Sequence, residues 1–537
     1  MPGGRAQRRI ERERIRHRGI VRRQIALAVA IVVLVPLFLV IDRHRARSTS
    51  EAAGAELGPG EARGASPTTP STTPPTTVGR AARVSIAKEN ARTGTEAWRL
   101  TGSPDAVRGY ADRTSVAAGD PFTLRVSTSS PTFTVEAYRM GYYGGRLGRL
   151  VWTSPATPGA VQAAAQTAST TRMVTAGWNP SLTVSTAGWP HGTYLLKLVV
   201  PTGQSYVPIT VRDDAGRSDL LVVDAVTTWQ AYNSWGSHNL YDGPRADPKL
   251  RSTKVSFDRP YAGSGADEFV PNELGVVATA ERLGLDVSYA TDIDVHQRPE
   301  LLRTHRAITF LGHDEYWSLE MRNGVEAARD AGTNLVFFGA NSAYRRIRLE
   351  ASALGPDRIV VNYRSAAADP LAASDPQRAT TSWREPPSAR PESALTGVFY
   401  ECNPVAAPGV VADPSAWMLE GTGLAKGDQI PGLVGSEYDR INRYWTTPSP
   451  IQAVLHSPVT CKGQASFSDA AYYTAASGAG VFATGTNAWI CHLVIGCPKV
   501  DDHVVRITEN LLRDFVRGPA AGRHPAVDNT AAVGIKP

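Results

Sequence analysis

The order of strand-like and helix-like segments is the strongest constraint on the fold of this chain. From about residue 80 to 213, short runs such as FTVEAYRM and TYLLKLVV alternate apolar and polar residues between turn signals. This pattern is typical of a β-sandwich. From Ser218 the pattern changes, because the continuous apolar run DLLVVDAV is typical of a strand that is buried on both faces of a parallel sheet. The sequence therefore predicts an all-β domain followed by an α/β domain.

In the second domain, strand-like runs alternate with helical periodicity. Strands are expected at 219–226, 286–290, 307–311, 334–339 and 479–486, and helices at 272–283, 319–331 and 502–516. Such alternation predicts a doubly wound α/β sheet. The intervening segment 350–475 is rich in Pro and Gly and shows no clear period.

A charge-free apolar run occupies residues 25–41, IALAVAIVVLVPLFLVI. As a helix it would be roughly 25 Å long, near the lower limit for crossing a hydrocarbon core of about 30 Å. Nine arginines precede it, which places the N-terminus inside. A cleaved signal peptide is the alternative, but DRHR follows the run where small residues would be expected. We expect an uncleaved signal-anchor, a single-pass protein of the cell membrane and an extracellular C-terminal region.

The net charge of +7 does not indicate a nucleic-acid partner. Twelve arginines against three acids give residues 1–47 a charge of +9, so the remainder carries −2. The basic residues are therefore expected to meet anionic lipid headgroups. The predicted organisation is a cytoplasmic basic segment (1–24), a transmembrane helix (25–41), a disordered Pro/Thr-rich stalk (42–80), a β-sandwich (81–214), an α/β domain (218–518) and a disordered tail (519–537).

All four cysteines lie late in the chain, where an oxidising environment would allow disulfides. Four cysteines permit three pairings, which sequence does not separate. Proximity alone favours Cys491–Cys497 and Cys402–Cys461. A zinc site is the other reading, but no C-x-x-C pair occurs.

Polar and aromatic clusters follow three of the expected strands. They are TTWQAYNSWG, GHDEYW and GAN, and SFDRPY lies between the first two. Because the carboxyl ends of parallel strands share one edge of a sheet, these clusters predict a functional cleft there. The simpler reading of GHDEYW is that Asp314 or Glu315 caps the following helix while Trp317 packs in the core.

Two kinds of chemistry suit these residues. A Glu beside a His can act as an acid–base pair, and Glu and Tyr oxygens suit an oxygen-loving cation such as ferric iron. The sequence has no G-x-S-x-G elbow, P-loop or dinucleotide fingerprint. No cysteine follows a central strand, which argues against a cysteine-dependent amidotransferase.

The ordered motifs VEAYRMGYYGG, TWQAYNSWG, SFDRPY, LDVSYATDIDVH, FLGHDEYW, NLVFFGANSAYRR and LVGSEYDR make the chain similar to the large (beta) subunit of N,N-dimethylformamidase. The resemblance covers roughly residues 105–517. It implies a β-sandwich followed by a glutamine-amidotransferase-like α/β domain. It also implies one iron ion held by two tyrosines and a glutamate, with an iron-bound water that attacks an amide.

Carried over by motif, the resemblance implies Tyr232, Tyr261 and Glu315 as the metal ligands, with Tyr241 as a reserve. It implies that His313, Asn341 and Glu437 orient the substrate and move protons. The predicted function is a membrane-anchored, extracytoplasmic, metal-dependent hydrolase of an amide C–N bond, acting on a small-molecule or cell-envelope substrate, and a homo-oligomer is possible. The alternative is a non-catalytic cell-surface binding module on the same fold.

Overall fold

The computed structural model describes residues 85–494 and 500–536. The described residues from 85 onward belong to one compact unit. The predicted basic segment, anchor and stalk all lie outside the described residues. The division of the remainder into domains at 81–214 and 218–518 stays a prediction.

The membrane assignment is corrected. Within the described ranges, every helix is too short or too polar to cross a bilayer, and the predicted span at 25–41 is not among them. We therefore retain neither the single-pass anchor nor the cell-membrane location with an extracellular C-terminal region. That prediction rested on the apolar run at 25–41 and on the charged residues that flank it, all of which lie outside the described residues.

Two sheets share one apolar core between residues 107 and 212. Their strand orders are β1-β3-β9 and β2-β11-β10-β4-β5, and β6 pairs with β4. Alternate residues of β10, including Tyr194, Leu196 and Leu198, enter this core, as the period-two pattern requires. The elements are α2 (Ile86–Asn90), β1 (Val107–Ala111), β2 (Ser115–Ala117), β3 (Pro121–Thr128), β4 (Thr132–Met140), β5 (Gly148–Thr153), β6 (Thr157–Pro158), β9 (Leu182–Ser185), β10 (Gly192–Val200) and β11 (Gly203–Arg212).

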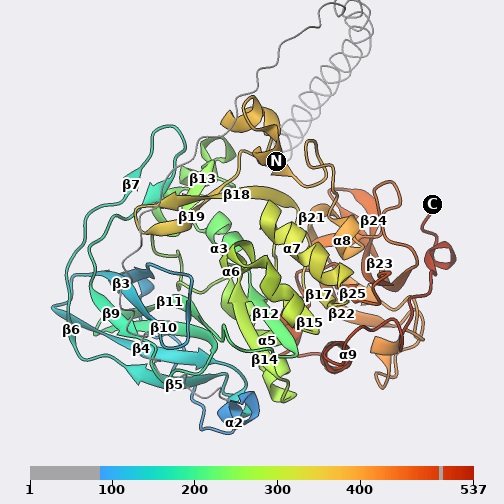
Figure 1. Cartoon of the computed structure of the whole chain (residues 1–537), viewed down its shortest axis with the longest axis horizontal. Coiled ribbons are helices and arrows are strands. Elements are labelled where there is room, and N and C mark those ends of the chain that lie inside the picture. Colours follow the sequence, from blue (N-terminus) through green and yellow to red (C-terminus); the bar gives the residue numbers. More distant parts are fainter. Residues whose placement is uncertain (1–84, 495–499, 537) are drawn as a thin grey trace, which may run out of the picture. The chain divides into compact units, whose positions relative to one another are not determined.

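A seven-stranded mixed sheet forms the centre of the remaining chain, with the order β14-β12-β15-β17-β25-β24-β23. Its first five strands are parallel, and β24 and β23 are antiparallel additions at one edge. The opposite edge strand, β14, lies beside β10 and β11 (Figure 1). The strands are β12 (Leu220–Asp224), β14 (Val287–Thr291), β15 (Ala307–Phe310), β17 (Asn334–Phe337), β23 (Ile451–Cys461), β24 (Gln464–Thr474) and β25 (Gly480–Ala483).

Helices cover both faces of the mixed sheet. Leu220 and Val222 of β12 enter the apolar cluster that contains α5 and α9, whereas Leu221 and Val223 enter the cluster that contains α7. The Ser318 hydroxyl accepts a hydrogen bond from the Met321 amide and so begins α7. The helices are α3 (Val226–Tyr232), α4 (Phe269–Asn272), α5 (Leu274–Arg282), α6 (Asp292–Gln297), α7 (Leu319–Asp330), α8 (Ser393–Thr396) and α9 (Asp502–Phe515).

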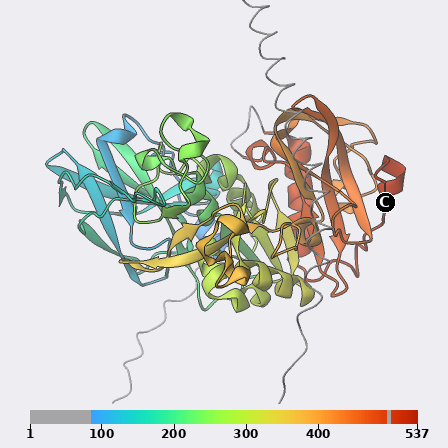
Figure 2. The ribbon, with the colours of Figure 1, turned by 90° about the horizontal axis from the view of Figure 1, so that it is seen from above.

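Strands are the main regular structure of the segment that resisted sequence interpretation, residues 350–475. It supplies part of a five-stranded sheet, β13-β19-β18-β16 with β20 paired to β18, and the long two-stranded sheet β21-β22. Figure 2 shows the long orange strands at one end of the ribbon and the blue and cyan strands of the first two sheets at the other. The remaining strands are β7 (Gln166–Thr167), β8 (Val174–Thr175), β13 (Lys254–Ser256), β16 (Tyr316–Ser318), β18 (Arg345–Ser352), β19 (Gly355–Val361), β20 (Thr381–Ser382), β21 (Phe399–Val410) and β22 (Gln429–Arg440).

The predicted fold class, a doubly wound α/β domain after a β-sandwich and a transmembrane helix, is therefore wrong. The described part of the chain is mainly β, with 35% strand against 23% helix, and its strands form six sheets. The individual helices and strands expected between residues 219 and 339 are confirmed to within a few residues. The predicted α/β domain at 218–518 included the segment 350–475 although that segment shows no clear period, and long antiparallel strands form there.

One of the two favoured disulfides is confirmed. Cys402 of β21 is bonded to Cys461 at the end of β23, which ties the β21-β22 pair to the antiparallel edge of the mixed sheet. The other favoured pair includes Cys497, which lies outside the described residues.

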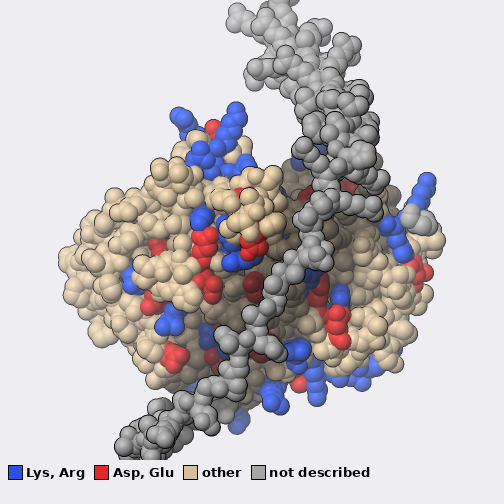
Figure 3. Space-filling view, turned by 45° about the horizontal axis from the view of Figure 1, so that its top comes forward, with Lys and Arg blue, Asp and Glu red and all other residues tan. Residues whose placement is uncertain are grey.

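Charged side chains of both signs are interspersed on the face shown in Figure 3. The described surface seen there carries no single basic stripe of the kind that tracks a nucleic-acid backbone.

Two buried polar contacts join the sheet β2-β11-β10-β4-β5 to the mixed sheet and its helix α5. The guanidinium of Arg139 on β4 meets the carboxylate of Glu281 on α5, with Nη1 3.1 Å from Oε2 and Nη2 2.5 Å from Oε1, and both side chains are fully buried. The hydroxyls of Thr193 and Thr210 donate to Oδ2 of Asp224, at 2.8 and 2.6 Å, at the carboxyl end of β12. These contacts fix the position of β12 and α5 against β10 and β11.

We expect Glu281→Gln to lower the free energy of unfolding by about 3–5 kcal/mol, because it leaves the buried Arg139 cation without its counter-charge. Urea denaturation followed by circular dichroism measures the change. The matched control is Glu300→Gln, since Glu300 is exposed on the short helix Pro299–Thr304, and its effect should stay within about 0.5 kcal/mol. Equal effects of the two variants would contradict the assigned role of the ion pair.

Asp224 should make stability depend on pH. Burial raises the pKa of Asp224 from 3.8 to about 6, against the opposing hydrogen bonds from the threonines. The folded state therefore keeps a proton that the unfolded state releases, so this contribution is complete below about pH 4 and is lost as pH rises through 6. Between about pH 4 and 6, the free energy of unfolding should fall with rising pH by up to about 1.4 kcal/mol per pH unit because of Asp224. We expect Asp224→Asn to remove this contribution to the slope, as measured by denaturation at several pH values. An unchanged slope would refute this. Asp219→Asn, at the partly exposed opposite end of the strand, should leave the slope as it is.

Candidate functional site

Three neighbouring parallel strands deliver polar side chains to one edge of the mixed sheet. The chain leaving β12 turns into α3, whose last residue is Tyr232. The chain leaving β15 carries His313 and Glu315, and the turn after β17 carries Asn341. Gly312 is required at the second of these turns: its φ is +56°, and a Cβ there would lie 2.9 Å from backbone and side-chain atoms of Asn272. The shared strand direction therefore brings these residues together.

Four side chains form what we call the Tyr–His–Glu cluster, consisting of Tyr232, Tyr241, His313 and Glu315. The Tyr232 hydroxyl lies 2.8 Å from the Tyr241 hydroxyl, 2.7 Å from Nε2 of His313 and 3.0 Å from Oε2 of Glu315. The Tyr241 hydroxyl donates to the same Glu315 oxygen. Nε2 of His313 lies 3.2 Å from that oxygen. Four polar groups, from the end of α3, the loop after it and the loop after β15, thus meet around one point.

The charge of Glu315 is balanced inside the protein. Burial alone would raise the pKa of Glu315, but the hydrogen bond and charge of His313, together with the Arg345 guanidinium 3.4 Å away, lower it to about 2. Burial would likewise lower the pKa of His313, but Glu315 and Glu437 raise it to about 10. The cluster therefore contains a carboxylate and an imidazolium at neutral pH.

Both phenols of the cluster are neutral in this arrangement. Burial, followed by the charge of Glu315, raises the pKa of Tyr232 and of Tyr241 well above the ordinary value. Their rings stack with centroids 4.4 Å apart, and the Arg364 guanidinium lies 4.5 Å from the centre of the Tyr241 ring. A cation bound among the oxygens would reverse the preference for the neutral form, because ligands bind metals in their deprotonated state.

A second group of side chains surrounds His313 on its other edge. Nδ1 of His313 lies 3.0 Å from the Ala340 carbonyl oxygen and 3.5 Å from Oε2 of Glu437. Glu437, on β22, accepts hydrogen bonds from the side-chain amides of Asn341 at 3.1 Å and Asn403 at 2.6 Å. Oδ1 of Asn341 is buried and accepts no hydrogen bond from the described residues. The imidazole thus connects the cluster to a carboxylate and an amide from distant parts of the chain.

Of the residues expected from sequence, the structure assembles Tyr232, Glu315, His313, Asn341 and Glu437. Tyr241, which the sequence analysis named as the reserve metal ligand, lies with them. Arg345 and Asn403 were not anticipated; the only signal for Arg345 was the basic pair that follows GANSAY. No local pattern marks Asn403, because β21 and β22 bring it to Glu437 through tertiary pairing.

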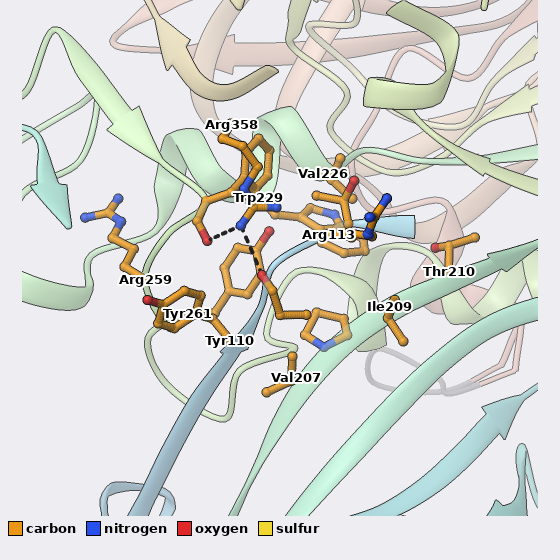
Figure 4. Close-up of a pocket in the computed structure, with 14 residues that line it drawn as sticks. Tyr110, Arg113, Val207, Ile209, Thr210, Val226, Trp229, Arg259, Tyr261 and Arg358 are labelled. Carbon is orange, nitrogen blue, oxygen red and sulfur yellow. Dashed lines mark hydrogen bonds between the residues drawn. The ribbon is translucent and has the colours of Figure 1, made fainter. Parts of the chain in front are cut away.

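Tyr261 lies elsewhere. It forms part of the wall of a small cavity, of about 20 Å³, together with Trp229, Tyr110 and Arg259 (Figure 4). Its ring lies edge-on to Trp229 with centroids 6.3 Å apart, and burial raises its pKa. None of the hydrogen bonds within the Tyr–His–Glu cluster involves Tyr261. The geometry therefore assigns the second phenol of the site to Tyr241.

The cluster differs from the commonest metal sites. The described residues contain no group of three or more His, Cys, Asp or Glu side chains that could hold a metal ion. The cluster instead offers two phenol oxygens and a carboxylate, and the Tyr232 hydroxyl lies 2.8 and 3.0 Å from the other two oxygens. Such spacings suit oxygens arranged around one ion with bonds near 2 Å. The donor set therefore fits a single hard cation.

Comparison with known proteins identifies one family. A sequence model of the family described as N,N-dimethylformamidase beta subunit-like, C-terminal, matches residues 134–502. This match covers more than two thirds of the chain and includes every residue of the cluster. No curated protein matches the chain.

Proposed function

Since the chain belongs to the N,N-dimethylformamidase beta subunit-like family, we propose that it is a metal-dependent hydrolase that cleaves an amide C–N bond. The observation that carries this proposal is the convergence of two phenols, a carboxylate and an imidazole at the carboxyl edge of the parallel strands. Buried groups with opposed charges at such an edge are typical of catalytic sites.

Tyr232, Tyr241 and Glu315 would hold the metal. Two phenolates and one carboxylate carry a charge of −3, which matches a ferric ion. When bound, such an ion lowers the pKa of a coordinated water and polarises a carbonyl oxygen. The nearby Arg345 lowers the pKa of Glu315, and the Arg364 guanidinium lies over the Tyr241 ring.

The remaining residues handle protons and orientation. Glu437 would accept a proton during attack and return it to the departing amine, as a general base and then a general acid. Its two hydrogen bonds, from Asn341 and Asn403, fix the direction of its carboxylate. Oδ1 of Asn341, which has no described donor, is available to a substrate N–H. His313 spans the distance between Glu437 and the ligand oxygens.

A second candidate function is a non-catalytic binding module. One observation favours it: His313 and Arg345 already balance the charge of Glu315. The carboxylate therefore needs no metal ion as a counter-charge. In that case the side chains would hold the loops in place and the surrounding surface would bind a partner.

We expect the purified protein to contain about one iron per chain and to show a visible tyrosinate-to-iron absorption band. Elemental analysis and absorption spectroscopy measure these. Tyr241→Phe should weaken the band and reduce the bound iron, whereas Tyr261→Phe is the matched control and should leave both unchanged. A band that persists in Tyr241→Phe but is lost in Tyr261→Phe would contradict the ligand assignment. Folded protein that takes up no iron would favour the binding module.

We also expect the iron-loaded protein to release amine from simple N-alkyl formamides and acetamides. Glu437→Gln should lower kcat by about 10²–10⁴-fold, because it removes the proton acceptor, while the iron content is retained. Amine release followed by a coupled assay gives the rates. Full activity in Glu437→Gln would remove that residue from the mechanism, and inactivity of the iron-loaded wild type toward all these amides would count against hydrolysis.

A further inference from the structure

A cavity of about 150 Å³ lies against the Tyr–His–Glu cluster. Its walls come from α3 and from the loop and short helix at residues 261–269. Tyr232 lines this cavity and also belongs to the cluster, so the cavity adjoins the cluster on the side of α3. Its volume gives room for a small organic group.

Aromatic side chains form much of the wall. Trp229 meets Tyr261 and Phe269 edge-on, with centroids 6.3 and 6.1 Å apart, and all three line the cavity. Aromatic faces attract cations through their quadrupole and also accommodate flat apolar groups. Tyr261 therefore lines a cavity beside the cluster, although it is not one of the proposed metal ligands.

The charged residues of the wall are all acidic. Asp267 and Glu268 line the cavity, and no Lys, Arg or His is among its described lining residues. Asp267 is exposed and its Oδ1 accepts from the backbone amide and hydroxyl of Ser264. Glu268 is half-buried, and its Oε2 accepts from the Asn272 amide at 3.0 Å. Burial raises the pKa of Glu268 and the charge of His313 opposes this, which places the carboxylate within electrostatic reach of the cluster.

We propose that this cavity is the substrate pocket and that it selects amides bearing a positively charged group, with Glu268 as the counter-charge. The inference rests on the proposed function for the chemistry, but the recognition of the cation depends only on the cavity. A substituent of the amide would place its ammonium group between Glu268 and the aromatic wall. Its carbonyl would then lie toward Tyr232 and the rest of the cluster.

Calorimetric titration with a matched pair of probes tests the recognition step. We expect benzylammonium to bind the full chain at least about tenfold more tightly than benzyl alcohol, which has the same ring but no charge; this ratio corresponds to about 1.4 kcal/mol. Glu268→Gln should abolish the difference and leave benzyl alcohol binding as it is. Glu300→Gln, an exposed acid outside the cavity, is the control and should keep the full preference. Thermal melting of each variant confirms that it is folded.

A kinetic comparison separates this inference from the proposed function. If the wild type hydrolyses 4-aminobutyramide with a KM at least about tenfold below that for butyramide, and Glu268→Gln raises only the first KM, both proposals are supported. If it hydrolyses both amides equally and Glu268→Gln changes nothing, the cation selectivity is overturned while hydrolysis stands. If it hydrolyses neither but binds benzylammonium through Glu268, the cation site is supported and hydrolysis is overturned. Equal binding of the two titration probes would overturn the inference directly.

Discussion

Burying the carboxylate of Glu315 costs free energy that only charged and hydrogen-bonding partners can offset, and the candidate site is built from those partners. Two phenols donate to one of its oxygens, His313 lies beside the same oxygen, and Arg345 faces the other. Removing a partner would leave a buried charge uncompensated. The same demand for compensation would make these oxygens a strong ligand set for a trivalent cation, so the groups that stabilise the fold and those that would perform chemistry are the same.

The scaffold positions these partners from widely separated parts of the chain. Parallel strands bring Tyr232, His313 and Asn341 to one edge, and the long β21-β22 pair returns Glu437 to the far side of His313. The Arg139–Glu281 pair holds the sheet that contains β4 against α5. That sheet therefore contributes to the site indirectly, by fixing α5 and the mixed sheet behind it.

The sequence analysis succeeded where local patterns are decisive and failed where they are not. Apolar runs and helical periodicity placed β12, β15, α7 and α9 correctly, because the burial period acts within a few residues. The fold class was wrong, because antiparallel strands such as β23 and β24 are specified by pairing with each other and with β25 rather than by a strong local period. The membrane assignment is not retained: it rested on an apolar run and its flanking charges, and no described helix is long and apolar enough to cross a bilayer.

From sequence alone, the motifs determined the family, the strand ends that carry polar groups, and five of the six residues expected at the site. Only the tertiary structure decided between Tyr241 and Tyr261, because both follow α3 in loops without a period and their distances from Glu315 depend on how those loops fold. It also decided that Glu437, Asn403 and Arg345 complete the surroundings of His313 and Glu315. The sequence determines which residue types follow each strand. Whether their side chains meet depends on contacts between segments far apart in the chain, and those contacts follow from the packing of the whole sheet.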